Sequence, residues 1–127
     1  MTEFPIEITQ LINLKVLYIL PCFPHELALD DEGSFCPIKT LPEEIGNLTN
    51  LTDLDLYGCI ALEELPEGIC NLSNLENLEL SHELSVLKKL PNNLHKLKKL
   101  KNLELPYGLD KNELKKVPNY VEVSTEP

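Results

Sequence analysis

The stretch LPEEIGNLTNLTDLDL at residues 41–56 decides the fold of this chain. Leu or Ile recurs at positions 41, 45, 48, 51, 54 and 56, so the apolar residues are first three or four apart and finally two apart. The wider spacing places side chains on one face of a helical turn, and the narrower one places them on one face of a strand. The stretch therefore predicts a short helical turn that is followed by a short strand.

The same frame recurs along the chain. It reads FPIEITQLINLKVLYI at 4–19, LPEGICNLSNLENLEL at 65–80 and LPNNLHKLKKLKNLEL at 90–105, and it stops after one turn in VPNYV at 117–121. Self-similarity with a period in the twenties is the signature of a solenoid, because each unit buries its apolar face only against its neighbours. We expect one domain over 1–127, with repeats near 4–40, 41–64, 65–89 and 90–116, a partial C-terminal turn at 117–121 and a tail at 122–127.

One copy of the frame is close to a known repeat pattern. It contains Leu51, Leu54, Leu56, Cys59, Leu62 and Leu65, followed by Pro66 and preceded by GNLTNL. This pattern resembles the leucine-rich-repeat family, and it is similar to the repeats of plant disease-resistance receptors and of related bacterial proteins. The resemblance implies an α/β solenoid of about four repeats, with a parallel inner sheet, short helical turns on the convex side and an inner sheet that usually binds another protein.

The ends and the first repeat depart from the pattern. The first repeat is lengthened by an insertion at 21–40, whose Pro and Gly residues predict a loop. No cap precedes the first repeat, so the strand at 14–19 is expected to have a bare outer edge. The sequence thus indicates either self-association through the uncapped N-terminal end or a piece of a longer solenoid.

Composition excludes several classes of partner. The net charge is −10 and all eleven basic residues are Lys. Because Arg is absent, the side chain best suited to bidentate contacts with phosphates and bases is missing, so we expect no nucleic-acid ligand. No apolar run approaches the ~18 residues of a membrane span, and the N-terminus does not resemble a signal peptide. The chain is therefore expected to be cytoplasmic and not to contact a membrane.

Charge is unevenly distributed along the solenoid. Residues 1–87 contain two Lys and sixteen acidic residues, whereas residues 88–127 contain nine Lys and five acidic residues. Sequence order is spatial order in a solenoid, so one end is expected to be acidic and the other basic.

The cysteines do not predict a disulfide framework, a zinc site or an active site. Cys22, Cys36, Cys59 and Cys70 are few and widely spaced, and no C-x-x-C motif occurs. Cys59 and His82 are expected on neighbouring turns, where imidazole could activate a thiol. The inward position of Cys59 favours an apolar filler instead. We therefore predict no enzyme and no cofactor, and we expect Cys70 to be exposed on the helical side.

Stacked strands place equivalent outward residues in columns. The first column is Lys15, Thr52, Glu76 and Lys101; the second is Val16, Asp53, Asn77 and Asn102; the third is Tyr18, Asp55, Glu79 and Glu104. Like charges opposite one another on a sheet are unfavourable, so three carboxylates in one column suggest selection for a basic partner, with aromatic anchors beside them. The alternative is a solvated acidic surface. The predicted partner-binding residues are Tyr18, Asp53, Asp55, Tyr57, Glu76, Asn77, Glu79, Lys101, Asn102 and Glu104.

The function expected from these columns is non-enzymatic binding of a protein partner with basic groups on the concave sheet. A calcium or magnesium site in the acidic column is a further alternative, but no loop spacing like that of an EF-hand supports it, and no metal is predicted. The alternative function is a structural, self-associating repeat unit or a fragment of a larger receptor-like solenoid.

Overall fold

A computed structural model describes residues 5–18, 38–56, 62–80, 87–106 and 109–124. Each repeat contains a short 3₁₀ helix followed by a short strand, as the Leu spacing predicts. In chain order the elements are η1 (Ile6–Gln10), β1 (Val16–Tyr18), η3 (Glu43–Asn47), β2 (Asp53–Leu56), η4 (Glu67–Asn71), β3 (Asn77–Leu80), η5 (Leu94–Lys96), β4 (Asn102–Glu104), α1 (Lys111–Leu114) and β5 (Glu122–Ser124).

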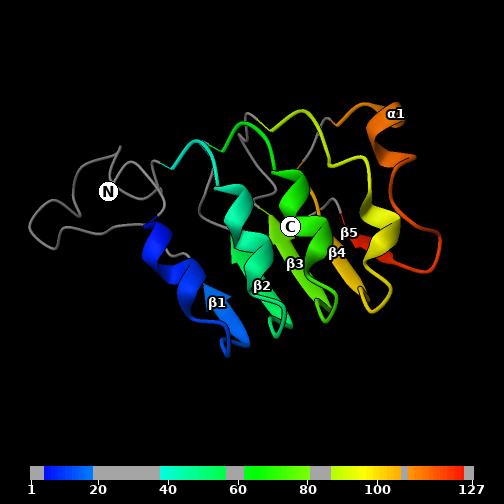
Figure 1. The fold of residues 1–127 in the computed structure, drawn as a ribbon. Helices are drawn as coiled ribbons and strands as arrows, with labels where there is room; N and C mark the ends of the chain where they lie inside the picture. The colour runs from blue at the N-terminus through cyan, green and yellow to red at the C-terminus, as the bar shows by residue number, and fades with distance from the viewer. Residues whose placement is uncertain (1–4, 19–37, 57–61, 81–86, 107–108, 125–127) are drawn as a thin grey trace, which may run out of the picture.

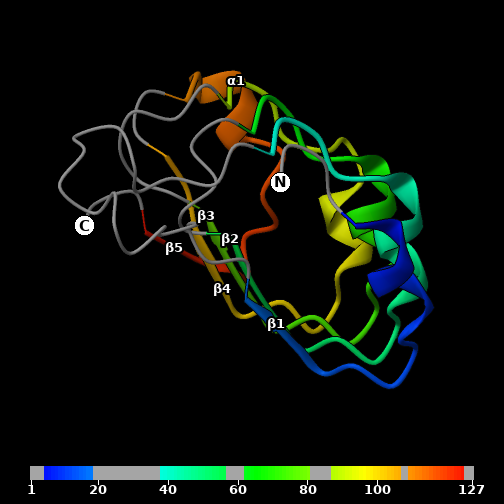
Figure 2. The same cartoon turned by 90° about the vertical axis from the view of Figure 1, so that its left-hand side faces the viewer.

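The strands form one parallel sheet in the order β1-β2-β3-β4-β5, which is also their order in the sequence. The repeats advance side by side along the sheet from the N-terminal to the C-terminal end, with the 3₁₀ helices in front of the strands (Figure 1). Seen from the side, strands and 3₁₀ helices form two separate layers (Figure 2). This is the parallel α/β solenoid predicted from the repeat frame.

Three of the four described 3₁₀ helices, η1, η3 and η4, begin directly after a proline, and all four end directly before a leucine. In the second repeat the Ile45 N–H donates to Pro42 O (3.1 Å) and the Leu48 N–H donates to Ile45 O (3.2 Å). Pro42 has a φ of −71° and lacks an N–H group, so it precedes a helical turn without loss of a hydrogen bond. The third repeat uses Pro66 in the same way.

The core is a continuous stack of leucines and isoleucines between the two layers. Leu54, Leu78 and Leu103 occupy equivalent positions on adjacent strands, and each is 1% exposed. Each repeat alone would leave such residues in water. Burial of a leucine side chain stabilises a fold by about 1.5–3 kcal/mol, so stacking is the main source of stability here.

Two glycines allow the helical turns of neighbouring repeats to approach closely. A Cβ atom on Gly46 would lie 2.5 Å from Gly68 O, and one on Gly68 would overlap the backbone carbonyl of Glu43. The spacing of η3 and η4 therefore requires residues without a side chain at both positions.

The C-terminal end contains a strand that differs from the sequence-based expectation. The repeat frame predicts a tail over 122–127, but Glu122–Ser124 form β5, which pairs with β4. The Glu122 N–H donates to Lys101 O at 2.8 Å, and Val121 is buried beside the last repeat. The leucines of the repeat frame are missing at 122–124. Pairing with β4 nevertheless satisfies backbone N–H and C=O groups that a tail would expose to water. The prediction of a tail is therefore wrong for residues 122–124.

Candidate functional site

The side of the sheet away from the 3₁₀ helices carries polar side chains. Along β2, Leu54 and Leu56 are buried whereas Asp53 and Asp55 are partly exposed, as period-two alternation requires. The same alternation places Asn77 and Glu79 outward on β3. We call this surface the open sheet face; its described members are Tyr18, Asp53, Asp55, Asn77, Glu79, Asn102 and Glu104.

The third column forms as predicted. Strand register pairs Tyr18 with Asp55, Asp55 with Glu79, and Glu79 with Glu104. In the backbone register, Ser124 of the additional strand β5 pairs with Glu104. Adjacent strands are about 4.8 Å apart, so three carboxyl groups lie in one row across the middle of the sheet.

Glu79, at the centre of this row, has a raised pKa. Burial raises it most, followed by the negative charges of Asp55 and Glu104 on the flanking strands and by a hydrogen bond with the Asp55 carboxylate. All of these effects disfavour the ionised form. A cation placed against the row would offset the effect of the neighbouring negative charges on this pKa.

Side-chain hydrogen bonds join the residues of the second column to one another. Asn102 Nδ2 donates to Asn77 Oδ1 (2.7 Å), and Asn77 Nδ2 donates to Asp53 Oδ1 (2.6 Å). The stacked frame predicts that these residues are neighbours on the sheet. It does not predict the hydrogen bonds between them, and it suggests these residues only as candidates for partner binding. Asn77 and Asn102 occupy the same position in successive repeats. Because the amide group of an Asn side chain both donates and accepts hydrogen bonds, this recurrence is the sequence signal for a ladder of side-chain hydrogen bonds.

In the first column, two predicted binding residues bond to each other. Lys101 Nζ lies 3.2 Å from Glu76 Oε1, in an exposed ion pair. Exposed pairs contribute roughly 0–1 kcal/mol, so this contact adds little stability. It does reduce the net charge at this edge of the face, and the acidic third column therefore dominates its electrostatics.

A hollow opens on the sheet between β1, β2 and β3. Its volume is about 90 Å³, and it is lined by Tyr18, Asp53, Leu54, Asp55, Asn77 and Glu79. The side chain of Tyr18, a residue that is 59% exposed, stands at the N-terminal side of the acidic row. The hollow has room for roughly three waters, or for the end of one side chain.

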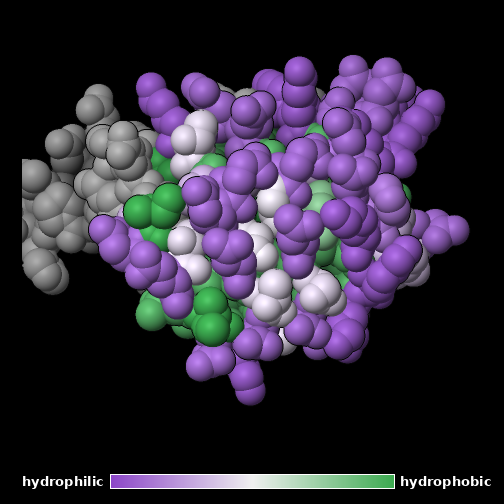
Figure 3. All heavy atoms as spheres, viewed as in Figure 1, coloured by the Kyte–Doolittle hydropathy of each residue, from purple (hydrophilic) through white to green (hydrophobic). Residues whose placement is uncertain are grey.

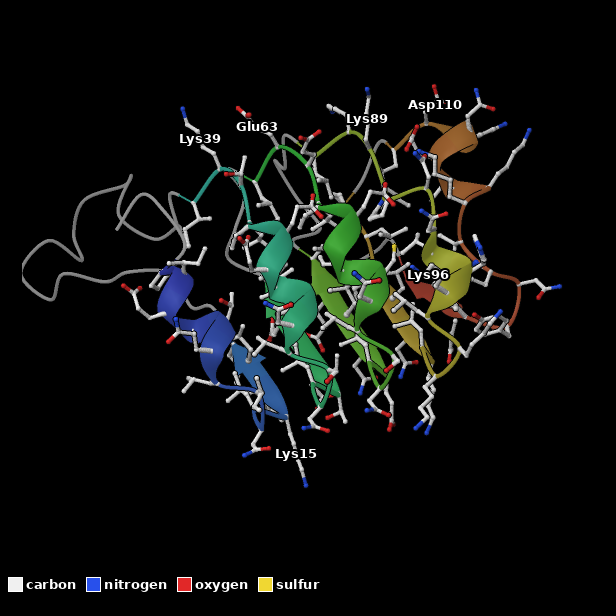
Figure 4. The ribbon with its side chains drawn as sticks, in the orientation of Figure 1. Lys15, Lys39, Glu63, Lys89, Lys96 and Asp110 are labelled. Carbon is white, nitrogen blue, oxygen red and sulfur yellow. The ribbon has the colours of Figure 1, made fainter. Side chains whose placement is uncertain are left out.

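One rim of the solenoid offers a contrast with this face. Figure 4 shows Lys39, Glu63, Lys89 and Asp110 following one another along that rim, so the rim carries charges of both signs. Because these charges have both signs, the rim does not produce an electrostatic potential of a single sign. The row of Asp55, Glu79 and Glu104 has a single sign, and this distinguishes the open sheet face as the candidate site.

Several predicted residues lie outside the described part of the structure. Tyr57, a predicted anchor, and the Cys59 and His82 pair belong to this group, as does most of the 21–40 insertion. Cys70 is described, and the expectation that it is exposed is wrong. Its side chain is 2% exposed because neighbouring helical turns pack over it, and burial raises the pKa of its thiol to about 11.

The described residues contain neither a metal-binding cluster nor a membrane span. No group of three or more His, Cys, Asp or Glu side chains among them is arranged to hold a metal ion. None of the helices in this part of the chain combines the length and apolar character needed to cross a bilayer.

Comparison with known proteins supports the fold assignment. A scan of protein-family models gave no match, and a search of curated proteins gave none. Among solved structures, the chain is similar to a leucine-rich-repeat protein of Leptospira interrogans, with 29% sequence identity and a TM-score of 0.62. The match covers 96% of this chain but only 34% of the Leptospira chain. This likeness supports a leucine-rich-repeat assignment for the chain.

Proposed function

We propose that the chain binds a protein partner with basic groups on its open sheet face. The observation that carries the proposal is the row of Asp55, Glu79 and Glu104 across adjacent strands, with Tyr18 at its end. Like charges opposite one another cost a few tenths to about 1 kcal/mol, a cost that a cationic ligand would remove.

The hollow beside this row fits the same interpretation. A lysine or arginine side chain of the partner would place its apolar stem against the Tyr18 ring and its charged head near Asp53, Asp55 and Glu79. Aromatic anchors beside desolvated charges are typical of the few residues that dominate binding energy at interfaces. Because the pKa of Glu79 is raised, binding of a cation should release a proton when the pH lies near that raised pKa.

A peptide selection tests the proposal. A random peptide library is selected on the wild-type protein, and the recovered peptides are measured against two triple variants of equal charge. The first, Asp55→Asn, Glu79→Gln and Glu104→Gln, removes the acidic row. The control, Glu44→Gln, Glu63→Gln and Glu64→Gln, removes three exposed carboxylates elsewhere.

We expect the recovered peptides to be rich in Lys or Arg. Their affinity should fall at least tenfold with the first variant, which corresponds to about 1.4 kcal/mol, and should change little with the control. Equal losses with both variants would show that only net charge matters and would reject the open sheet face as the site.

A further inference from the structure

The turn between η5 and β4 carries three exposed lysines on a firmly held backbone. Lys96, Lys98 and Lys99 alternate with Leu97 and Leu100, which are buried in the core. The Lys98 N–H donates to Lys96 O (3.0 Å), and the Leu100 N–H donates to Leu97 O (3.3 Å). The surface over η5 is mostly hydrophilic, whereas apolar side chains gather near β1 (Figure 3). We call Lys96, Lys98 and Lys99 the lysine turn.

Neutral side chains of the preceding repeat position two of these lysines. Lys96 Nζ donates to Asn71 Oδ1 (3.1 Å), and Lys99 Nζ donates to Asn74 Oδ1 (2.7 Å). Within the described residues, no ion pair joins the lysine turn to a carboxylate. An amide oxygen orients an ammonium group without cancelling its charge, and an ammonium group has three N–H donors. Each positioned lysine therefore keeps its charge and two donors for another group.

Stacking of the repeats does not require lysine in this turn. Asn50 Nδ2 donates to Ile12 O (2.9 Å), and Asn74 Nδ2 donates to Thr49 O (2.7 Å), so an asparagine links this turn to the preceding repeat twice. Lys99 occupies the position of these asparagines in the fourth repeat. The residues equivalent to the lysine turn are all neutral in the second and third repeats: Asn47, Thr49, Asn50, Asn71, Ser73 and Asn74.

The lysine turn is therefore a local positive surface on a chain with a net charge of −10. Like charges this close repel one another, and carboxylates placed among them would replace that repulsion with attraction. Nucleic acid fits less well, because the chain has no Arg for bidentate phosphate contacts and its overall charge repels a uniform polyanion. A short acidic stretch of a protein meets the lysines without that larger opposing charge.

We propose that the lysine turn binds an acidic segment of a protein partner, whose carboxylates accept hydrogen bonds from the ammonium groups of Lys96, Lys98 and Lys99. Hydrogen bonds between ionised groups are stronger than those between neutral groups, and the held backbone limits the entropy lost on binding. The contact does not depend on the proposed binding at the open sheet face, because that face takes basic groups.

A fluorescent oligo-glutamate peptide serves as the probe in a fluorescence-anisotropy titration. The salt concentration is about 0.1 M, where the Debye length is about 10 Å and distant charges are screened. One triple variant, Lys96→Gln, Lys98→Gln and Lys99→Gln, removes the lysine turn. The control, Lys88→Gln, Lys89→Gln and Lys115→Gln, removes three exposed lysines elsewhere and has the same net charge. Circular dichroism establishes that every variant is folded.

A second pair of variants tests the geometry. Asn71→Asp places a carboxylate where Lys96 donates, so the protein itself would neutralise part of the lysine turn. Asn47→Asp introduces the same charge at the equivalent, exposed position of the second repeat. An oligonucleotide of single-stranded DNA with the same charge as the peptide replaces it in a parallel titration.

We expect the wild type to bind the peptide and the lysine-turn variant to lose about tenfold in affinity, as three exposed charge contacts together predict. The control triple variant should lose much less. Asn71→Asp should weaken binding by about two- to threefold, and Asn47→Asp should leave it nearly unchanged.

Three outcomes would overturn the proposal. A wild type that does not bind the peptide at concentrations up to about 1 mM shows that the lysine turn takes no acidic segment. Equal losses within either pair of variants show that only net charge matters. Tighter binding of the oligonucleotide than of the peptide shows that the surface selects phosphates instead of carboxylates.

Discussion

Among single residues, Glu79 shows most clearly how position creates a site. Its carboxyl group lies between those of Asp55 and Glu104, and burial together with these charges raises its pKa. An acid whose pKa is higher in the folded than in the unfolded state holds its proton more tightly when folded. The stability that this group contributes is then fully present below the unfolded pKa and is lost as the pH rises through the raised, folded value.

Replacement of Glu79 by Gln should therefore stabilise the protein at neutral pH. We expect Glu79→Gln to raise the free energy of unfolding at pH 7 by a few tenths to about 1 kcal/mol. The gain should disappear at a pH below the ordinary glutamate pKa, where wild-type Glu79 is already neutral. Urea unfolding at both pH values measures it, and Glu44→Gln on the exposed helical side serves as control. A gain that does not depend on pH would contradict the electrostatic cause.

The glycine pair permits a second prediction about a single residue. Gly68→Ala should destabilise the fold by about 1–3 kcal/mol, because the added methyl group overlaps the Glu43 carbonyl and forces η3 and η4 apart. Thermal or urea unfolding measures the loss. Asn47→Ala, an exposed substitution on the neighbouring turn, should change stability much less. Equal effects of the two substitutions would mean that the close approach is not required.

Among the strands and helical turns, the sequence predicts most where leucines repeat. Leu51, Leu54 and Leu56 determine which strand residues face inward, so the register of the third column follows from the leucine spacing alone. The sequence predicts less about properties that depend on contacts outside the repeat pattern. The pKa of Glu79 depends on the extent of its burial, which spacing alone does not give.

The β5 strand escapes prediction for a related reason. Its residues, Glu122–Ser124, lack the leucine pattern, and the strand exists because β4 offers an open edge beside a chain that Tyr120 and Val121 hold in place. The Tyr120 hydroxyl donates to Leu97 O at 2.9 Å, which ties the segment to the last full repeat. Contacts of this kind join residues that are far apart in the sequence, and no local sequence pattern predicts them.

Tyr120→Phe should loosen β5 selectively. It removes one hydrogen bond and keeps the ring, so we expect a loss of about 0.5–1.5 kcal/mol. Native-state hydrogen exchange should show faster exchange for the Glu122 amide, which bonds to Lys101 O, and unchanged exchange in β2 and β3. Uniform acceleration across all strands would show instead that the C-terminal segment stabilises the whole solenoid.

In the molecule as a whole, the buried core and the proposed binding surface lie on different parts of the solenoid. Its leucine core lies between the layers, whereas the acidic row lies on the open sheet face, where substitutions need not disturb the core. Along the sequence, acidic residues prevail over 1–87 and Lys residues prevail over 88–127. The separation of the core from the acidic row supports the proposed binding of a partner across the sheet.

Ionic strength tests the electrostatic part of the proposed partner binding. The Debye length falls from about 10 Å at 0.1 M to about 3 Å at 1 M salt, so affinity for a basic peptide on the acidic row should drop steeply over this range. Titrations at several salt concentrations measure this dependence. A peptide affinity that does not change with salt would argue against the acidic row.

Binding to the open sheet face is tested most sharply by a map of backbone amide chemical shifts while a selected basic peptide is added to the isotope-labelled protein. If the open sheet face binds, the largest changes lie in Asp53–Leu56, Asn77–Leu80 and Asn102–Glu104, and those of η3, η4 and η5 stay small. The largest changes in the 3₁₀ helices, with the strands unaffected, would contradict this function and move the binding surface to the convex side.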